Sequence, residues 1–151
     1  MSGMRLRETV GRPMEILLVE DDLEDAGSTI EALRQGDVPC RVSLVRDGEE
    51  ALEFLGRVGR FGRAPRPDLV LLDLNLPRKN GREVLAELKA DPDLAPIPVV
   101  VLTSSSTHEE ILREEGLHVE SYLVKPVDWP RFVQVVKSLR RYLLSDVILP
   151  R

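Results

Sequence analysis

Apolar and polar residues follow one another along the chain in blocks whose period changes regularly. Short, mostly apolar runs are typical of strands that are buried on both faces of a sheet. Each run is followed by a stretch in which apolar residues recur at steps of three and four, the spacing of an amphipathic helix. The expected strands are residues 14–20, 40–47, 68–74, 97–103 and 120–125. The expected helices are residues 23–35, 48–56, 80–90, 108–116 and 129–143.

This alternation of strands and helices predicts an α/β fold, a doubly wound five-stranded parallel sheet of the flavodoxin-like, three-layer α/β/α type. A chain of 151 residues suits one such domain. We expect it to cover residues 14–143, with residues 1–13 as a mobile tail and residues 144–151 as a C-terminal extension. Right-handed crossovers place the loops that follow the strands at one edge of the sheet, where ligands of open α/β sheets bind.

The overall composition excludes several other classes of protein. A formal charge of −5 argues against a nucleic-acid partner, which requires a basic face. No apolar run is long enough to cross a membrane, and the first 13 residues lack the apolar core of a signal peptide. The one cysteine, Cys40, cannot form a disulfide within the chain, which fits a reducing cytoplasm.

Polar side chains follow four of the five expected strands, at the edge where ligands bind. They are Glu20, Asp21, Asp22, Asp73, Asn75, Thr103, Ser104 and Lys125. Any one of them could be an ordinary loop residue, but together they are harder to ascribe to chance. Crowded carboxylates repel one another unless a cation intervenes, and Mg²⁺ takes one or two carboxylates, several waters and phosphate oxygen. The histidines, His108 and His118, lie away from this edge and do not suggest a transition metal.

A carboxylate beside Mg²⁺ can attack a phosphoryl group and become an acyl phosphate. The phosphoryl oxygens then require donors, which Lys125 and either Thr103 or Ser104 could supply. Catalysis in such a site consists of positioning and charge stabilisation.

The motifs on this edge resemble those of the receiver domain of two-component response regulators. They are ILLVEDD (residues 16–22), PDLVLLDLNLPRKNG (67–81), VVVLTSSS (99–106) and SYLVKP (121–126). The resemblance implies that Asp73 is the phosphoacceptor and that Asp21 is the principal Mg²⁺ ligand, with Glu20 acting through water. It also implies that the backbone carbonyl of Asn75 binds the metal.

The same resemblance assigns roles to the remaining residues of the edge. Lys125 would bind Asp73 before phosphorylation and the phosphoryl group after it, and the Lys125–Pro126 peptide bond would be cis. Thr103 would bond the phosphoryl group and move when it arrives, in concert with Tyr122 on the last strand. Ser104 would supply a further donor.

A narrower resemblance links the chain to the single-domain regulators that partner bacterial phytochromes. It is carried by the loop GRVGRFGRAPRPDL, the segment LNLPRKNGREVLAELKADPDL and the tail LLSDVILP. It implies that the partner is a sensor histidine kinase of the phytochrome class. With no second domain after the last helix, we expect no DNA-binding output from this chain.

The last helix and the tail contain more apolar residues than a single buried face of a helix can hold. If Val136, Leu139 and Leu143 point inward, we expect the remaining apolar side chains to face outward. The expected contact residues are Trp129, Phe132, Val133, Tyr142, Leu144, Val147, Ile148 and Leu149. A contiguous apolar patch is often a contact surface. In the family this region forms the usual dimer surface, so the resemblance implies a homodimer that pairs through the last helix and residues 144–150.

Two other functions remain open alongside a phosphoaccepting switch. One is a receiver-like binding module that works without phosphorylation, against which the intact set Asp21, Asp73, Thr103 and Lys125 argues. The other is a Mg²⁺-dependent phosphatase with an Asp nucleophile, similar to the haloacid dehalogenases. That enzyme needs a second Asp two residues after the nucleophile, where this chain has Asn75. We therefore expect no enzyme activity beyond self-catalysed phosphotransfer and slow dephosphorylation.

Overall fold

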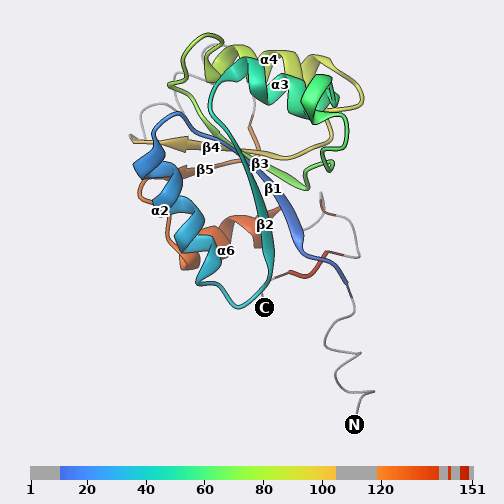
Figure 1. Ribbon diagram of the computed structural model, residues 1–151. Helices are drawn as coiled ribbons and strands as arrows, with labels where there is room; N and C mark the ends of the chain where they lie inside the picture. Colours follow the sequence, from blue (N-terminus) through green and yellow to red (C-terminus); the bar gives the residue numbers. More distant parts are fainter. Residues whose placement is uncertain (1–10, 105–118, 140–142, 144–146, 150–151) are drawn as a thin grey trace.

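The expected sheet of five parallel strands is confirmed by the computed structural model, which describes residues 11–104, 119–139, 143 and 147–149. In this part of the chain the strand order is β2-β1-β3-β4-β5 (Figure 1). The strands are β1 (Met14–Val19), β2 (Cys40–Val45), β3 (Leu69–Asp73), β4 (Val99–Thr103) and β5 (Ser121–Val124). The helices are α2 (Leu23–Arg34), α3 (Gly48–Gly56), α4 (Gly81–Ala90) and α6 (Trp129–Ser138), with the 3₁₀ helix η1 (Gly59–Phe61). The helix expected over residues 108–116 lies outside the described residues.

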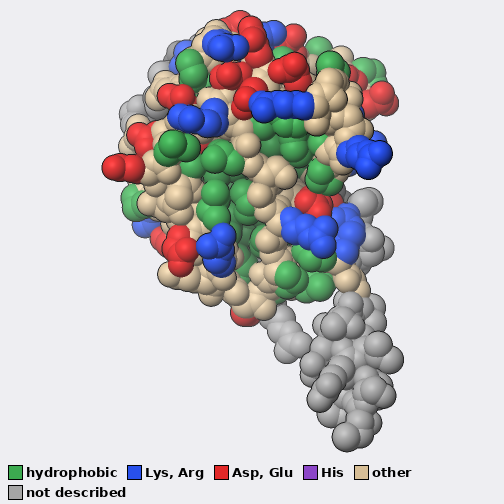
Figure 2. Space-filling view, in the orientation of Figure 1, with side chains coloured by type: hydrophobic (Ala, Val, Ile, Leu, Met, Phe, Trp, Pro, Cys, Tyr) green, Lys and Arg blue, Asp and Glu red, His purple; other side chains and the backbone are tan. Residues whose placement is uncertain are grey.

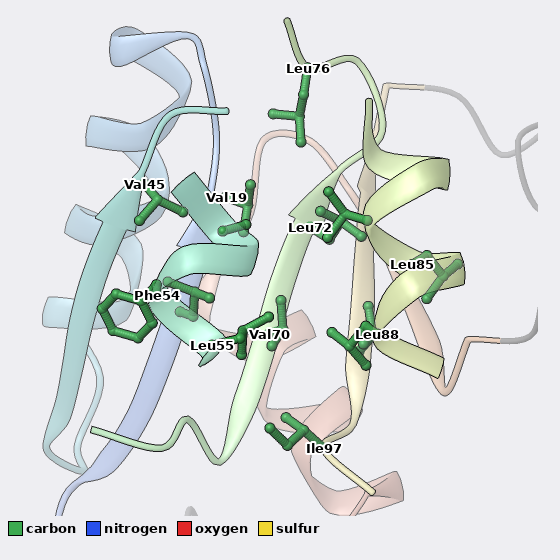
Figure 3. Close-up of a cluster of buried hydrophobic side chains, with 14 of the residues drawn as sticks. Val19, Val45, Phe54, Leu55, Val70, Leu72, Leu76, Leu85, Leu88 and Ile97 are labelled. Carbon is green, nitrogen blue, oxygen red and sulfur yellow. The ribbon is translucent and has the colours of Figure 1, made fainter. Parts of the chain in front are cut away.

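Helices cover the two faces of the sheet in pairs, α3 and α4 on one face and α2 and α6 on the other (Figure 1). Because successive strand residues point to opposite faces, the sheet contributes to two separate cores. Figure 3 shows the first, in which Val70 and Leu72 of β3 face Leu55 of α3 and Leu88 of α4. The two cores fix β3 at the centre of the molecule, with the end of the strand at the ligand edge.

Each described α-helix begins at a side chain that caps its first turn. Asp22, Asp47, Asn80 and Asp128 accept hydrogen bonds from backbone N–H groups that have no partner within the helix. The cap also corrects one expectation, since β2 ends at Val45 instead of continuing to Asp47. Asp47 has extended backbone but serves as the cap of α3, and so the chain leaves the sheet before it.

Described residues near the two ends of the chain, Arg12 and Val147, meet at the edge of the sheet opposite the ligand edge. Arg12 makes a two-pronged ion pair with the buried Asp68, with contacts of 2.7 and 2.8 Å. Arg12 also forms an isolated parallel bridge with Val147, and its carbonyl accepts a hydrogen bond from the N–H of Ile148. The expected boundary of the tail at residue 13 is therefore corrected, because Arg12 is tied to the domain.

The last helix buries more of its apolar side chains than we expected. Phe132 is fully buried, together with Val136 and Leu139, in the core on the α2 and α6 face. The expectation that Phe132 faces outward is wrong, because residues 132, 136 and 139 recur at helical spacing on the inward side. Val147 is also buried in this core, so its expected exposure is wrong as well. Residues 142 and 144 lie outside the described residues.

Some apolar surface nevertheless stays partly open to solvent. Figure 2 shows a band of hydrophobic side chains down the face where β2 forms an edge of the sheet, with charged side chains on either side. Trp129 and Val133 of α6 are half-buried, as are Ile148 and Leu149. Val124 of the other edge strand, β5, is more than a third exposed. Within the described residues, every helix is too short or too polar to span a bilayer.

Candidate functional site

A cleft of about 540 Å³ lies at the carboxyl ends of the strands, at the edge where the sequence predicts a ligand site. Eleven residues line it: Glu20, Asp21, Asp22, Asp25, Ser28, Thr29, Asp73, Asn75, Ser104, Lys125 and Pro126. Five of these are acids, and the one basic residue is Lys125. Parallel strands bring their carboxyl ends to one edge, and so β1, β3, β4 and β5 all contribute to the cleft.

Asp73 is the last residue of the central strand β3 and is almost fully buried. One carboxylate oxygen accepts a hydrogen bond from the N–H of Asn75 at 2.9 Å, and the other lies 2.9 Å from the ammonium of Lys125. Burial alone would raise the pKa of Asp73, but hydrogen bonding with Glu20, Lys125 and Asn75 outweighs it and lowers the pKa. Asp73 is therefore an anion at neutral pH.

The pKa of Glu20 is shifted in the opposite direction to that of Asp73. Its side chain is 1% exposed, and burial, together with the neighbouring Asp73 carboxylate, raises its pKa to about 7 against the opposing effect of Lys125. Glu20 Oε1 lies 2.6 Å from Lys125 Nζ but is not aligned for a hydrogen bond to it. The buried oxygen therefore lacks a hydrogen-bond donor among the described residues.

Lys125 is the centre of charge in the cleft. Its ammonium lies within 3.0 Å of the carboxylates of Glu20, Asp25 and Asp73. Burial would lower its pKa, but the contacts of the ammonium with the carboxylates of Asp73, Glu20 and Asp25 raise it well above its ordinary value. The expected cis peptide bond to Pro126 is confirmed. Lys125 is therefore always protonated, which agrees with its expected contact with Asp73.

The residues expected to respond to phosphorylation lie at different depths. Ser104 is exposed and lines the cleft, whereas Thr103 is buried at the end of β4. The carbonyl of Thr103 accepts a hydrogen bond from the N–H of Lys125 at 2.8 Å, which links the ends of β4 and β5. Tyr122 is partly buried and packs against the core on the α3 and α4 face, away from the cleft.

The donor set fits a hard divalent cation that keeps part of its water shell. In the described stretches, no group of three His, Cys, Asp or Glu side chains is arranged to enclose a metal ion. Mg²⁺, however, binds through one or two carboxylates and retains several waters. Asp21 is exposed beside the buried pair Glu20 and Asp73, and the buried oxygen of Glu20 accepts no hydrogen bond from the described residues, which leaves it able to accept one from a water bound to a cation.

Asp25 is the one ionic partner of Lys125 that the sequence analysis missed. The other residues expected in the cleft end or follow strands, whereas Asp25 lies in the first turn of α2. The signal that could have identified it is its spacing of four residues, one helical turn, after Asp21. Ser28 and Thr29 extend the same wall of the cleft along α2.

The geometry offers an ionised carboxylate, a fixed ammonium 2.9 Å from it, a crowded set of carboxylate oxygens and an open approach from solvent. This combination suits the transfer of a phosphoryl group to a carboxylate with a divalent cation bound. A general acid two residues after Asp73 is absent, since Asn75 stands there.

Comparison with known proteins gives one consistent family. The model of the response regulator receiver domain matches residues 16–137. Response regulator Rcp1 of Synechocystis sp. is 43% identical over 138 residues, which cover 91% of this chain and 94% of that protein. The solved structure of the phosphorylated cyanobacterial phytochrome response regulator RcpA is 46% identical, with a TM-score of 0.71 over 93% of this chain and all of that one. The Mn²⁺-bound form of Rcp1 is 42% identical, with a TM-score of 0.70 over 92% of this chain and all of that one.

Proposed function

Because the chain belongs to the response regulator receiver domain family of two-component signalling, we propose that Asp73 is its phosphoacceptor and that phosphorylation there switches the domain. The observation that carries this proposal is the position of Asp73. It ends the central strand, stays ionised although it is buried, and lies 2.9 Å from Lys125. A carboxylate held in this way is ready to attack without first losing a proton.

The phosphoryl group comes from a phosphohistidine of a sensor kinase. An oxygen of Asp73 attacks the phosphorus, and the bond between phosphorus and the imidazole nitrogen breaks. The electron pair leaves with the imidazole, which takes a proton from water, and Asp73 becomes an acyl phosphate. Lys125 holds one phosphoryl oxygen, and Ser104, which lines the cleft, offers a hydroxyl to another.

We assign the cation as Mg²⁺, with Asp21, Asp73 and the backbone carbonyl of Asn75 as ligands and Glu20 acting through water. Bound there, the ion neutralises charge on the carboxylates and on the phosphoryl oxygens. The support is the chemistry of the donors, all of which are oxygen atoms at the edge of the cleft. The Mn²⁺-bound form of Rcp1 agrees with a divalent cation in relatives of this chain.

We assign the switch to Thr103 and Tyr122. Thr103 joins the ends of β4 and β5 through its carbonyl, and Tyr122 lies on β5 against the core. Movement of Thr103 toward a phosphoryl group would therefore also displace β5. Because interfaces and packed cores rearrange between discrete states, a small displacement there is able to change a surface.

We propose that the kinase is a bacterial phytochrome, because the similar protein RcpA is a phytochrome response regulator and the likeness covers nearly the whole chain. We place the exchange in the cytoplasm, where a lone thiol such as Cys40 stays reduced. We also propose a homodimer through α6 and the C-terminal extension, for which the partly open side chains of Trp129, Val133, Ile148 and Leu149 provide the support.

Incubation with acetyl phosphate and Mg²⁺, followed by mass measurement of the intact protein, tests the function. The wild-type chain should gain one phosphoryl group, and Asp73→Asn should gain none, because an amide does not attack phosphorus here. Asp91→Asn, which changes an acid after α4 outside the cleft, is the matched control and should label normally. Undiminished labelling of Asp73→Asn would place the nucleophile elsewhere, and an unlabelled wild type would favour a phosphorylation-independent module. Steady release of phosphate from simple esters would favour the phosphatase instead.

A further inference from the structure

Lys125 is held from two sides of the cleft, by β1 and β3 on one side and by α2 on the other. Glu20 and Asp73 follow or end strands, and Asp25 lies in the first turn of α2. The Nζ atom of Lys125 is 3.0 Å from Asp25 Oδ2 and 2.9 Å from Asp73 Oδ2. The ammonium therefore bridges the helix and the central strand.

Both ends of the bridge between Asp25 and Lys125 are fixed by backbone contacts. The N–H of Asp25 donates to Asp22 Oδ1 at 3.1 Å, as part of the cap of α2. The N–H of Lys125 donates to the carbonyl of Thr103 at 2.8 Å. The ion pair thus connects two anchored segments that lie 100 residues apart in the sequence.

Under the proposed function, the three carboxylates around Lys125 would have different roles once the site is phosphorylated. Asp73 would carry the phosphoryl group in place of its own negative charge, and Glu20 would hold the cation through water. Asp25 would bind neither the phosphoryl group nor the cation. It is therefore the one carboxylate of the three that would stay in contact with the ammonium throughout the transfer. Without it, Lys125 would have no carboxylate among its described partners to hold it in place as the phosphoryl group arrives.

We propose that Asp25 is a positioning residue for phosphotransfer, which keeps the ammonium of Lys125 beside Asp73 in the place that a phosphoryl oxygen enters. The proposal rests on the proposed function of Asp73 and adds a residue to that site. A lysine side chain loses considerable rotamer entropy when it is held in one conformation. If Asp25 already holds Lys125 in place before the phosphoryl group arrives, that entropy is not lost during the transfer, and the barrier to transfer is lower.

A contrary view is that the contact is an ordinary surface ion pair, which contributes little. The side chain of Asp25 is 45% exposed, whereas that of Lys125 is 16% exposed. Partial burial of the ammonium favours a functional role, and the exposure of Asp25 limits the size of the effect. We expect removal of the anchor to slow transfer by about threefold to tenfold.

The test is the rate of labelling by acetyl phosphate at several donor concentrations, measured with saturating Mg²⁺ on the full chain. Asp25→Ala should lower the maximal rate. The half-saturating concentration should stay the same or fall, because a negative charge that repels the anionic donor is gone. Asp25→Glu should recover most of the maximal rate, since a longer carboxylate still reaches the ammonium.

Glu24→Ala is the matched control, because it removes an equal charge from the same turn of α2 at a residue that does not line the cleft. It should leave the maximal rate unchanged. Affinity for Mg²⁺ gives a second readout, and Asp25→Ala should weaken it less than Asp21→Ala does.

Three results would overturn the positioning role alone: a wild-type maximal rate in Asp25→Ala, an equal loss in Glu24→Ala, or no recovery in Asp25→Glu. Each of these leaves the function of Asp73 intact, because the wild-type chain still becomes labelled. Failure of the wild-type chain to label would instead remove the proposed function and the inference with it.

Discussion

Glu20 and Asp73 both contact Lys125, but the pKa of Asp73 is lowered and that of Glu20 is raised. Asp73 is stabilised as an anion by the Asn75 amide and by Lys125, whereas Glu20 is buried with a carboxylate as its neighbour. The pKa of Glu20 is therefore raised to about 7, so that near pH 6 it holds a proton that an exposed glutamate would have lost.

A dependence of stability on pH follows from the raised pKa of Glu20, which is about 7 in the folded chain against an ordinary value of 4.5. Between these two pH values the folded state binds more protons than the unfolded state, so stability falls as pH rises. In EDTA, the free energy of unfolding of the wild-type chain should drop by about 1–3 kcal/mol from pH 5 to pH 8. Urea unfolding at a series of pH values measures this drop.

Glu20→Gln should remove most of that slope, because the amide has no proton to lose. Glu53→Gln on the outer side of α3 should retain the wild-type slope. Equal slopes in all three proteins would show that Glu20 does not carry the effect.

The sequence located the charged residues of the cleft because parallel strands deliver their last residues to one edge. Asp21, Asp73 and Lys125 could therefore be predicted from the sequence alone. Asp25 could not, because it reaches the cleft from a helix, and Phe132 was predicted on the wrong side of α6. A helix with apolar residues on several faces does not reveal from its sequence which face the sheet covers.

At the scale of elements, the junction between β3 and α4 controls the position of Asp73. Gly81 is the first residue of α4, and a Cβ atom there would lie 2.5 Å from the carbonyl oxygen of Asp73 and 2.6 Å from the Cα atom of Leu74. Both neighbours are backbone atoms, which cannot rotate away. The helix therefore begins where it does only because residue 81 has no side chain.

Gly81→Ala should push the start of α4 away from β3 and displace Asp73. We expect a loss of stability of about 1–3 kcal/mol and a slower rate of labelling by acetyl phosphate. Gly27→Ala is the control, because a Cβ atom at this position within α2 meets nothing within 4 Å. It should stabilise the chain by about 0.5–1 kcal/mol and label normally. Thermal unfolding measures the stability of both variants, and mass measurement gives their rates of labelling. If Gly81→Ala has the stability and the labelling rate of the wild type, the close contact at residue 81 does not position Asp73.

Elements were predicted well in type and less well at their ends. Alternation of apolar runs and helical spacing is a local property, so all five strands could be found from the sequence. The end of β2 depends on whether Asp47 pairs in the sheet or caps α3, and both choices suit its sequence neighbours. The close approach of Gly81 to Asp73 depends on tertiary packing, which cannot be read from a local pattern of residues in the sequence.

At the scale of the whole molecule, described residues near both ends of the chain, Arg12 and Val147, form part of the domain. Asp68 accepts hydrogen bonds from Arg12 and from the N–H of Glu15, and Val147 is buried close to them. The sequence could not reveal this contact, because the two segments lie at opposite ends of the chain. Removal of the C-terminal extension would take away the buried Val147 and open the core of the domain, so truncation is a poor test of dimer formation.

A point substitution on α6 tests the proposed homodimer without opening the core. Val133 is half-buried in the described chain and belongs to the proposed contact surface, so Val133→Asp should place a charge in the interface and separate the protomers. Val58→Asp is the control, since Val58 is 55% exposed in the loop before η1, away from α6. Light scattering at micromolar concentration should give twice the chain mass for the wild type and for Val58→Asp, and the chain mass for Val133→Asp. The apolar character of the surface predicts pairing without phosphate, so Asp73→Asn should also be a dimer. A wild-type monomer, with or without acetyl phosphate, would refute the dimer, and a dimeric Val133→Asp would move the interface away from α6.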